Sequence, residues 1–358
     1  MSKAAPEVPD ASAVWSAEDT TPSEIEDALR QLLQEHCAGE GAYVPARVLN
    51  LVVVVDREWR GEIMNRLEQV GRYHASRTIL CEVEAGRETI DASAVMTVGA
   101  ADGDLHLMRE RVVVELGQKH IAKLDTIVDP LVVTDLPTLV WAPHGHAEAV
   151  DALLHISQVV LIDSVNELDP ASALARAKEL AKEAYVVDLA WLRTTPWRER
   201  VASTFDPPRW RDELLRIDGV TVRHRPDSSV AGVLFFGWLA SRLEWSTGTL
   251  MQANGSVRGR AHGHRDDVTL ALEPDVGQSV PGLAGVEIHT SSGMSIALDR
   301  GPGGLVARRR DRKGHEQSWT VLGASRGEGG ILGEGIRQAL LRDPAYRRAL
   351  DSGEAFLR

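Results

Sequence analysis

The apolar positions in the first half of the chain predict helices that alternate with strands. Apolar side chains recur at helical spacing over residues 25–36, after a Thr-Pro pair that is typical of a helix start. The run over residues 48–55 (VLNLVVVV) is apolar on both faces, which is typical of a central strand covered on both sides. Further strand patterns lie at 78–83, 93–98, 111–116, 138–141 and 159–162. This alternation predicts an N-terminal α/β sandwich domain over residues 21–165, after a flexible arm over residues 1–20.

The pattern changes in the second half. Residues 171–184 are rich in Ala, Lys, Glu and Leu and predict a helix, and residues 230–243 predict an apolar one. From residue 255 to residue 322, short alternating runs are separated by Gly, Pro and Asp, which predicts antiparallel strands. Two helical segments follow, near 331–341 and 344–355. We expect an α+β domain over residues 166–358, with a largely antiparallel sheet and terminal helices.

Composition narrows the classes of partner and location. The chain has 358 residues, 43% of them apolar, and a formal net charge of -12. An acidic protein repels phosphate backbones and anionic lipids, so neither nucleic acid nor a membrane is an expected partner. The first ten residues lack the apolar core of a secretory signal, and no apolar run reaches the ~18 residues that span a bilayer. These features predict a cytoplasmic protein.

Two histidine pairs have a spacing that metal ligands also use. His144 and His146, like His262 and His264, are one residue apart and could reach one metal ion. The spacing supplies no third ligand, so histidines of surface loops are the favoured interpretation and no metal is expected.

The residue types of catalytic and cofactor sites are also missing from their usual patterns. The glycine cluster over residues 323–335 matches neither nucleotide-binding motif, and Glu328 and Glu334 would repel phosphate. Cys81 lies in an apolar strand, and Cys37 lies near the C-terminus of a helix, where a thiolate is disfavoured. We therefore predict no catalytic residue and no cofactor.

Polar residues at the starts of two predicted strands form a first candidate site. Arg47 and Asn50 lie at one start, and His74, Ser76 and Arg77 lie at the next. Such residues often cap the ends of helices and strands. They could equally form a shared polar binding site at one end of the sheet. Both interpretations stay open from the sequence.

Residues 308–313 (RRRDRK) are the one concentrated basic run. Charges at the edge of a hairpin discourage sheet-to-sheet aggregation, which is the favoured interpretation. The alternative is that the run docks an acidic partner surface or a phosphorylated ligand.

The most distinctive stretch is rich in Trp and Arg and covers residues 188–200 (DLAWLRTTPWRER). Trp197 shares a helical face with apolar residues, so we expect it in the core. Trp and Arg carry much of the binding energy at protein interfaces. We predict a partner-binding surface formed by Trp191, Arg193, Thr194, Arg198 and Arg200.

Four motifs resemble a known family. They are RVLNLV at 47–52, HASR at 74–77, DLPTLVW at 135–141 and DLAWLRTTPWR at 188–198. The sequence resembles the OpcA family of glucose-6-phosphate dehydrogenase assembly proteins over about residues 45–345, and its composition is compatible with an actinobacterial member. The resemblance implies a non-catalytic protein that binds glucose-6-phosphate dehydrogenase, promotes its active oligomeric assembly and so regulates the entrance to the oxidative pentose phosphate pathway.

Two other functions remain as alternatives. A sugar-phosphate hydrolase or isomerase would use His74 as its base, with Arg47 and Arg77 as a phosphate clamp. A ligand-sensing module would bind NADPH or a sugar phosphate at the polar strand ends or at the basic run. Turnover of pathway intermediates, or calorimetric binding of these ligands, would distinguish them from an assembly protein.

Overall fold

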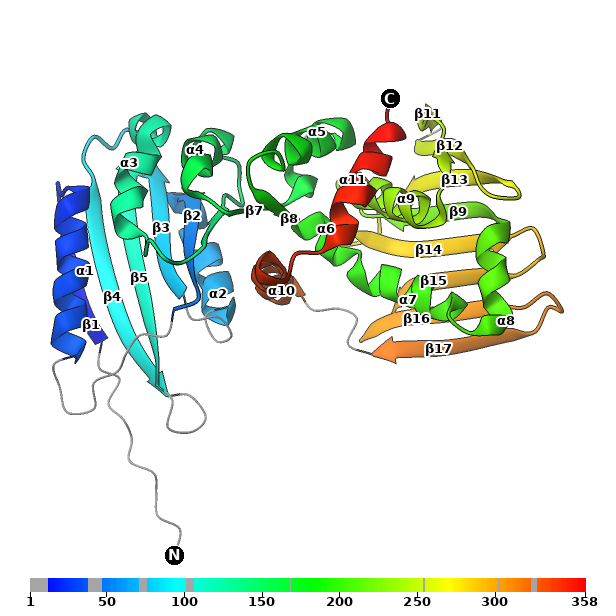
Figure 1. Cartoon of the computed structure of the whole chain (residues 1–358), viewed down its shortest axis with the longest axis horizontal. Helices are drawn as coiled ribbons and strands as arrows, with labels where there is room; N and C mark the ends of the chain where they lie inside the picture. Colours follow the sequence, from blue (N-terminus) through cyan, green and yellow to red (C-terminus); the bar gives the residue numbers. More distant parts are fainter. Residues whose placement is uncertain are drawn as a thin grey trace, which may run out of the picture. The chain divides into compact units, whose positions relative to one another are not determined.

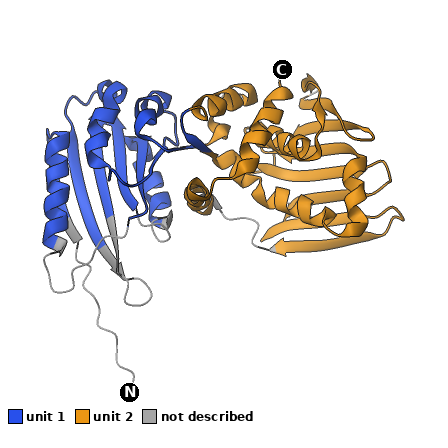
Figure 2. Cartoon of the chain, viewed as in Figure 1, with its two compact units in different colours: residues 1–162, 183–186 blue, residues 163–182, 187–358 orange. Residues whose placement is uncertain are grey.

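The computed structural model describes residues 12–37, 47–70, 76–100, 106–167, 169–253, 255–301, 303–322 and 327–358. The chain divides into two compact units (Figure 2). Unit 1 contains residues 1–162 and 183–186, and unit 2 contains residues 163–182 and 187–358. The predicted fold class is confirmed, because unit 1 is an α/β domain and unit 2 combines helices with a largely antiparallel sheet.

An eight-stranded sheet forms the centre of unit 1, in the order β1-β4-β5-β3-β2-β6-β7-β8 (Figure 1). The strands are β1 Ser12–Ala17, β2 Leu49–Asp56, β3 Ser76–Glu84, β4 Asp91–Ala100, β5 His106–Gly117, β6 Thr138–Trp141, β7 Val159–Ile162 and β8 Tyr185–Asp188. Neighbouring strands from β5 to β7 run parallel, and β4 and β1 add antiparallel pairs beyond β5. The first seven residues of β2 are all buried, which confirms a central strand covered on both faces.

The helices of unit 1 are α1 Pro22–Cys37, α2 Arg60–Val70, α3 Leu124–Val128 and α4 Ala147–Leu153. The predicted start of α1 is confirmed by a capping box. The Thr21 backbone N–H donates to Glu24 Oε2 at 2.8 Å, and the Glu24 N–H donates to Thr21 Oγ1 at 3.4 Å. The backbone hydrogen bond from Thr21 lowers the pKa of Glu24.

Two strands of this sheet were not predicted. The expectation of a flexible arm over residues 1–20 is wrong for Ser12–Ala17, because β1 pairs with β4 from Ser12 opposite Thr97 to Ala17 opposite Ala92. β8 follows directly on a segment predicted as helix to residue 184. Residues 1–11 of the expected arm lie outside the described residues.

The sheet of unit 2 has nine strands, in the order β10-β12-β13-β9-β14-β15-β16-β17, with β11 paired to β12 (Figure 1). The strands are β9 Ile217–His224, β10 Ser246–Thr247, β11 Met251–Ala253, β12 Ser256–His262, β13 Asp267–Pro274, β14 Leu283–Thr290, β15 Ser295–Gly301, β16 Gly304–Arg310 and β17 Glu316–Leu322. Only the pair of β13 with β9 is parallel among these strands. The antiparallel sheet predicted for residues 255–322 is confirmed.

The helices of unit 2 are α5 Pro170–Leu180, α6 Leu189–Arg193, α7 Thr195–Phe205, α8 Pro208–Arg211, α9 Ser229–Leu243, α10 Gly327–Leu341 and α11 Pro344–Ala355. Every residue from Val230 to Ala240 in α9 is buried, because the helix packs against the sheet and against α11. The crossing of α9 and α11 is close at Gly237, where a Cβ atom would lie 2.0 Å from the Ala349 carbonyl oxygen. A larger residue therefore does not fit at this point.

Among the described residues, no helix is long and apolar enough to cross a membrane.

Candidate functional site

The strand order of unit 1 defines where a ligand would bind. The parallel strands follow the order β5-β3-β2-β6-β7. The first of them along the chain is β2, and its neighbours β3 and β6 lie on opposite sides of it. In doubly wound sheets of this order, ligands bind at the carboxyl ends of the strands, where the order reverses. In this chain, that place lies between residues 56–61, which follow β2, and residues 142–146, which follow β6.

Aromatic and charged side chains lie at this place between residues 56–61 and 142–146, which we call the reversal point. Trp59 belongs to a 3-10 turn over Arg57–Trp59 and stacks on His144, with ring centroids 4.6 Å apart. His146 Nε2 lies 3.2 Å from Asp56 Oδ1, and its backbone has a φ of 57° at the start of α4. Burial lowers the pKa of His144. The first histidine pair therefore packs onto the segment after β2, and does not stand in an isolated surface loop.

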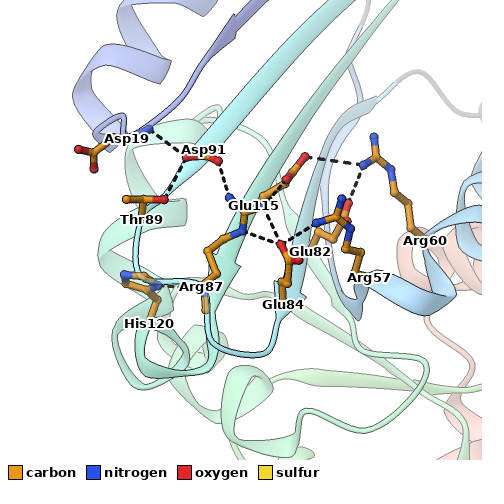
Figure 3. A network of polar contacts seen from close by, with 11 residues as sticks. Asp19, Arg57, Arg60, Glu82, Glu84, Arg87, Thr89, Asp91, Glu115 and His120 are labelled. Carbon is orange, nitrogen blue, oxygen red and sulfur yellow. Dashed lines mark hydrogen bonds and ion pairs between the residues drawn. The ribbon is translucent and has the colours of Figure 1, made fainter.

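On the other side of β2, arginines and carboxylates form a network that Figure 3 shows. Arg60 Nη1 lies 2.9 Å from Glu82 Oε2 and 3.7 Å from Glu115 Oε1, and Arg57 Nη1 lies 2.6 Å from Glu84 Oε2. Glu82 is only 1% exposed, and neither of its oxygens accepts a well-aligned hydrogen bond within the described parts of the chain. Burial raises the pKa of Glu82, against the opposing effect of Arg60.

Arg87 extends the same network to the β3–β4 turn (Figure 3). Its guanidinium donates to Glu84 and, at 2.9 Å, to Glu115, and it also pairs with Asp91. Asp91 accepts the backbone N–H of Asp19 at 2.9 Å, which joins the start of α1 to the sheet. The arginines are thus matched by carboxylates of the chain itself, and the network stabilises the ends of β3, β4 and β5.

The residues at the reversal point do not fit a dinucleotide. A dinucleotide pyrophosphate needs glycines in the turn after the first strand, so that the backbone can approach it at the N-terminus of the helix. Here the turn carries Asp56, Glu58 and Trp59, and Glu62 lies in the first turn of α2. These carboxylates repel phosphate, the two arginines of the segment, Arg57 and Arg60, are paired with carboxylates of β3, and the Trp59 indole stacks on the loop after β6. No group of three or more His, Cys, Asp or Glu residues able to hold a metal ion occurs among the described residues.

The predicted polar site lies at the opposite, amino ends of the strands. Arg47 Nε donates to Glu110 Oε1 at 2.9 Å, and Arg77 Nε donates to Glu110 Oε2 at 2.7 Å. Arg77 also donates to the Leu131 carbonyl oxygen at 2.9 Å. Glu110 is 2% exposed, so both guanidinium groups neutralise a buried carboxylate. No local pattern singles out Glu110, which is brought opposite Arg77 by the pairing of β3 with β5.

Asn50 is fully buried and connects β2 to the loop before β6. Its amide nitrogen donates to the Val133 carbonyl at 3.0 Å, and its oxygen accepts the Val133 N–H at 2.9 Å. Ser76 Oγ lies 3.3 Å from Thr78 Oγ1, and His74 lies outside the described residues. Since Arg47, Asn50 and Arg77 are engaged by the chain itself, the structure favours their interpretation as structural residues.

Within unit 2, Asp188 is the N-cap of α6 and a centre of hydrogen bonding. Its carboxylate accepts the Ala190 N–H at 2.9 Å, the Ser164 hydroxyl at 2.6 Å and the Tyr346 hydroxyl at 3.1 Å. The side chain is 1% exposed, and burial raises its pKa to about 6. One carboxylate thereby joins the start of α6 to α11 and to the segment before α5.

The side chains after Asp188 are held in the same way. Trp191 Nε1 donates to Asp343 Oδ2 at 2.9 Å, and the Arg198 guanidinium lies 3.5 Å from the centroid of the Trp191 ring. Arg193 makes two hydrogen bonds to Asp163, at 2.7 and 2.6 Å. The Thr194 hydroxyl donates to the Trp191 carbonyl at 2.7 Å.

These contacts correct the predicted partner-binding surface. Trp191, Arg193 and Thr194 are 2%, 6% and 0% exposed, so they offer no surface to a partner. Arg198 and Arg200 are partly exposed, and burial lowers the pKa of Arg198 to about 10. Trp197, at 1% exposed, is confirmed as a core residue. The Trp- and Arg-rich pattern belongs to a buried cluster of hydrogen bonds and ion pairs within unit 2. Trp and Arg also occur at such buried places, because the indole N–H and the guanidinium group can bind partners of the chain itself.

The remaining sequence candidates fall in ordinary structural settings. Cys81 is fully buried, which raises its pKa to about 12 and excludes a reactive thiolate. The side chain of Cys37 and residues 323–326 of the glycine cluster lie outside the described residues, and the rest of the cluster begins α10. His262 and His264 are exposed, and His262 pairs with Asp267 at 2.7 Å.

Comparison with solved structures gives only a weak likeness. An oxidoreductase from Sinorhizobium meliloti matches with a TM-score of 0.48 and 12% identity, over 87% of this chain and 95% of the other. A scyllo-inositol dehydrogenase from Lactobacillus casei matches with a TM-score of 0.44 and 8% identity, over 87% of this chain and 94% of the other. Likenesses of this strength carry no functional inference.

Two domain descriptions and several curated relatives agree on a family. A protein of Synechococcus elongatus, named OpcA and assigned by its name to the OxPP cycle, is 27% identical over 199 residues, 54% of this chain and 44% of the relative. Its namesake in Nostoc punctiforme is 32% identical over 139 residues, 38% of this chain and 30% of the relative. The matched stretches thus span less than half the length of these relatives.

The family models match each half of the chain separately. Residues 67–179 match a model described as the N-terminal domain of the glucose-6-phosphate dehydrogenase subunit. Residues 184–350 match a model described as the C-terminal domain of the same protein. Both models carry the OpcA name, in the order expected along the chain. The chain therefore belongs to the OpcA family.

Proposed function

We propose that this protein is a non-catalytic, cytoplasmic partner of glucose-6-phosphate dehydrogenase that promotes the active oligomeric assembly of that enzyme. The observation that carries the proposal is the reversal point of unit 1. An enzyme of this architecture would bind its dinucleotide there, but Trp59 stacks on His144 at this place and the nearby arginines are paired with carboxylates of the chain itself. The two family models, each described as a domain of a glucose-6-phosphate dehydrogenase subunit, support the choice of partner.

Activation by such a partner has a simple physical requirement. The protein must bind the active assembly of the dehydrogenase more tightly than the inactive one, because a partner with equal affinity shifts no equilibrium. A preference of about 1.4 kcal/mol shifts the ratio of the two forms about tenfold. The activated dehydrogenase would in turn bind this protein more tightly, since the coupling is reciprocal.

Mixing the two purified proteins tests the proposal. We expect them to co-elute in size-exclusion chromatography, with a larger dehydrogenase assembly by light scattering and a higher kcat/KM. The dehydrogenase alone, at the same concentration, is the control for spontaneous assembly. Separate elution together with unchanged kinetics would rule out the assembly function.

The enzymatic alternative has lost its main support. A hydrolase or isomerase would need Arg47 and Arg77 as a phosphate clamp, but both guanidinium groups are bound to the buried Glu110. Turnover of a pentose phosphate intermediate by the isolated protein, abolished in His74→Ala, would restore that alternative.

A further inference from the structure

The basic run over residues 308–313 contributes one arginine to an aromatic cluster of unit 2. The Arg309 guanidinium lies 4.9 Å from the ring centroid of Trp210 and 5.8 Å from that of Trp319. The Arg209 guanidinium lies 5.3 Å from the same Trp210 ring. We call these four residues the Arg–Trp cluster. Its members come from α8 and from the neighbouring strands β16 and β17, which follow α8 by about a hundred residues and form this edge of the sheet.

The charges of the Arg–Trp cluster are not balanced. Arg308 and Arg312 of the same basic run pair with Asp299 and Glu213. Neither Arg209 nor Arg309 forms an ion pair with a carboxylate in the described parts of the chain. Burial and the neighbouring Arg209 lower the pKa of Arg309, and the opposing effect of nearby Asp311 does not cancel them. An anionic group would relieve this repulsion.

The cluster is also accessible and partly pre-organised. Arg209 is exposed, whereas Trp210, Arg309 and Trp319 are half-buried. Arg309 donates to the Gln317 side chain, and its stacking on two indoles restricts its rotation. The indole Nε1 of Trp210 is a buried donor without a hydrogen-bond partner among the described residues. Planar guanidinium donors of this kind bind carboxylates in pairs of hydrogen bonds.

We propose that the Arg–Trp cluster docks a carboxylate-bearing segment of the protein partner. This proposal rests on the proposed function, in which that partner is glucose-6-phosphate dehydrogenase. The chain carries a net charge of -12, so an acidic segment is repelled by the protein as a whole and attracted only by a local positive site. The indole faces add apolar contact area that a peptide segment can cover and an isolated phosphate cannot. Trp and Arg together are the residue types most enriched at the energetic centres of interfaces.

A double variant, Arg209→Gln with Arg309→Gln, tests the docking site. Affinity for the dehydrogenase is expected to fall by at least about tenfold, the order of magnitude that follows from losing central arginines of an interface. The dependence of affinity on salt is expected to weaken, because two interacting charges are gone. The control is Arg347→Gln with Arg348→Gln on α11, which removes two other exposed arginines and leaves the affinity unchanged. Circular dichroism and thermal unfolding verify that each variant is folded.

A single substitution at an exposed position keeps the test valid if the double variant misfolds. Arg209 is exposed on the surface of α8, so Arg209→Glu keeps the fold and reverses the charge, and it should weaken binding further than Arg209→Gln. Unchanged affinity in both the double variant and Arg209→Glu would overturn the docking site while leaving the proposed function intact. No binding by the wild type would instead overturn the proposed function, and the docking site with it. Calorimetric binding of inorganic phosphate that the double variant abolishes, with dehydrogenase affinity retained, would overturn the docking site in favour of a small-anion site.

Discussion

Asp188 shows how one buried carboxylate can organise several segments at once. It caps α6 and also accepts hydrogen bonds from Ser164 and Tyr346, so these groups replace the water that an exposed carboxylate would bind. Removal from water still dominates, because the pKa is raised from 3.8 to about 6. The folded state therefore binds a proton at Asp188 more readily than the unfolded chain does.

This shift predicts an unusual dependence of stability on pH. The folded-state pKa exceeds the unfolded value, so the contribution of Asp188 is fully present below pH 3.8 and is lost as the pH rises through about 6. Asp188→Asn keeps a capping oxygen but does not titrate. Between pH 4 and pH 8, the stability of the variant relative to the wild type should rise by about 2 kcal/mol, which is most of what the whole shift represents. Urea unfolding of both proteins over this range measures it, and a constant difference would show that the pKa of Asp188 is not raised.

Trp191→Phe separates a core role from an interface role. Phenylalanine keeps most of the packing but cannot donate to Asp343, so the free energy of unfolding should fall by about 2 kcal/mol, as for a lost hydrogen bond to a charged group. Affinity of the folded variant for the dehydrogenase should not change. Urea unfolding and a binding assay provide the two readouts, and Trp59→Phe, at a 39% exposed site, should cost less. Normal stability with impaired binding would return Trp191 to the interface.

The residues of the candidate sites could be recognised from the sequence, but their partners could not. Arg47 and Arg77 are recognisable as polar residues at strand starts, but their shared partner Glu110 lies in β5 and is brought there by strand pairing. The same holds for Trp210 and Arg309, which are about a hundred positions apart in sequence. Local patterns indicate residue types, whereas the partner of a buried charge is set by the fold.

At the scale of elements, the strongest apolar patterns predicted the structure well. β2 and α9 contain the longest unbroken buried runs in the described residues of their units, and both stand out as long apolar runs. β1 was not predicted because it is an edge strand with an exposed Val14, which removes the apolar alternation. β8 was not predicted because its four residues follow a helical pattern without a turn signal between them. Short strands owe their existence to pairing rather than to local propensity.

The crossing of α9 and α11 gives a prediction for these two elements. Gly237→Ala places a methyl group against the Ala349 carbonyl and the Gly353 nitrogen, so the helices must separate, and we expect a loss of about 1–3 kcal/mol, as for other overpacked cores. Gly333→Ala in α10 is the matched control, since nothing lies within 4 Å of its added Cβ. That variant should gain up to about 1 kcal/mol from helix propensity. Thermal unfolding compares the two, and equal stability would show that the crossing can widen at little cost.

At the scale of the whole molecule, the chain passes between its units more than once. It leaves unit 1 after β7, forms α5 in unit 2, and returns to unit 1 for residues 183–186. Unit 1 therefore takes its last strand from a segment that lies beyond a helix of unit 2. Nothing in the local pattern marks this exchange, because each segment has an ordinary composition for its own element.

Because β8 comes from a segment beyond α5, we can predict how unit 1 associates when it is produced without that strand. A fragment of residues 12–162 leaves β7 with an unpaired edge, and exposed edges promote association. A matched fragment of residues 12–188, with residues 163–182 replaced by an equally long Gly/Ser linker, keeps β8. Light scattering should show the linked fragment as a monomer and the shorter one as larger species. Two monomers of equal stability would mean that β8 is dispensable for unit 1.

The packing of α11 against α5 has a consequence for biosynthesis. Lys178 Nζ in α5 lies 2.8 Å from Glu354 Oε2 in α11, and the two helices are separated by nearly the whole of unit 2. At a translation rate of roughly 5–20 residues per second, α11 is synthesised on the order of ten to thirty seconds after α5. Leu174, which is fully buried and lies beside Gly353 of α11, has no α11 to cover it during that interval. Nascent chains of this protein should therefore depend on chaperones until translation has reached the last helix.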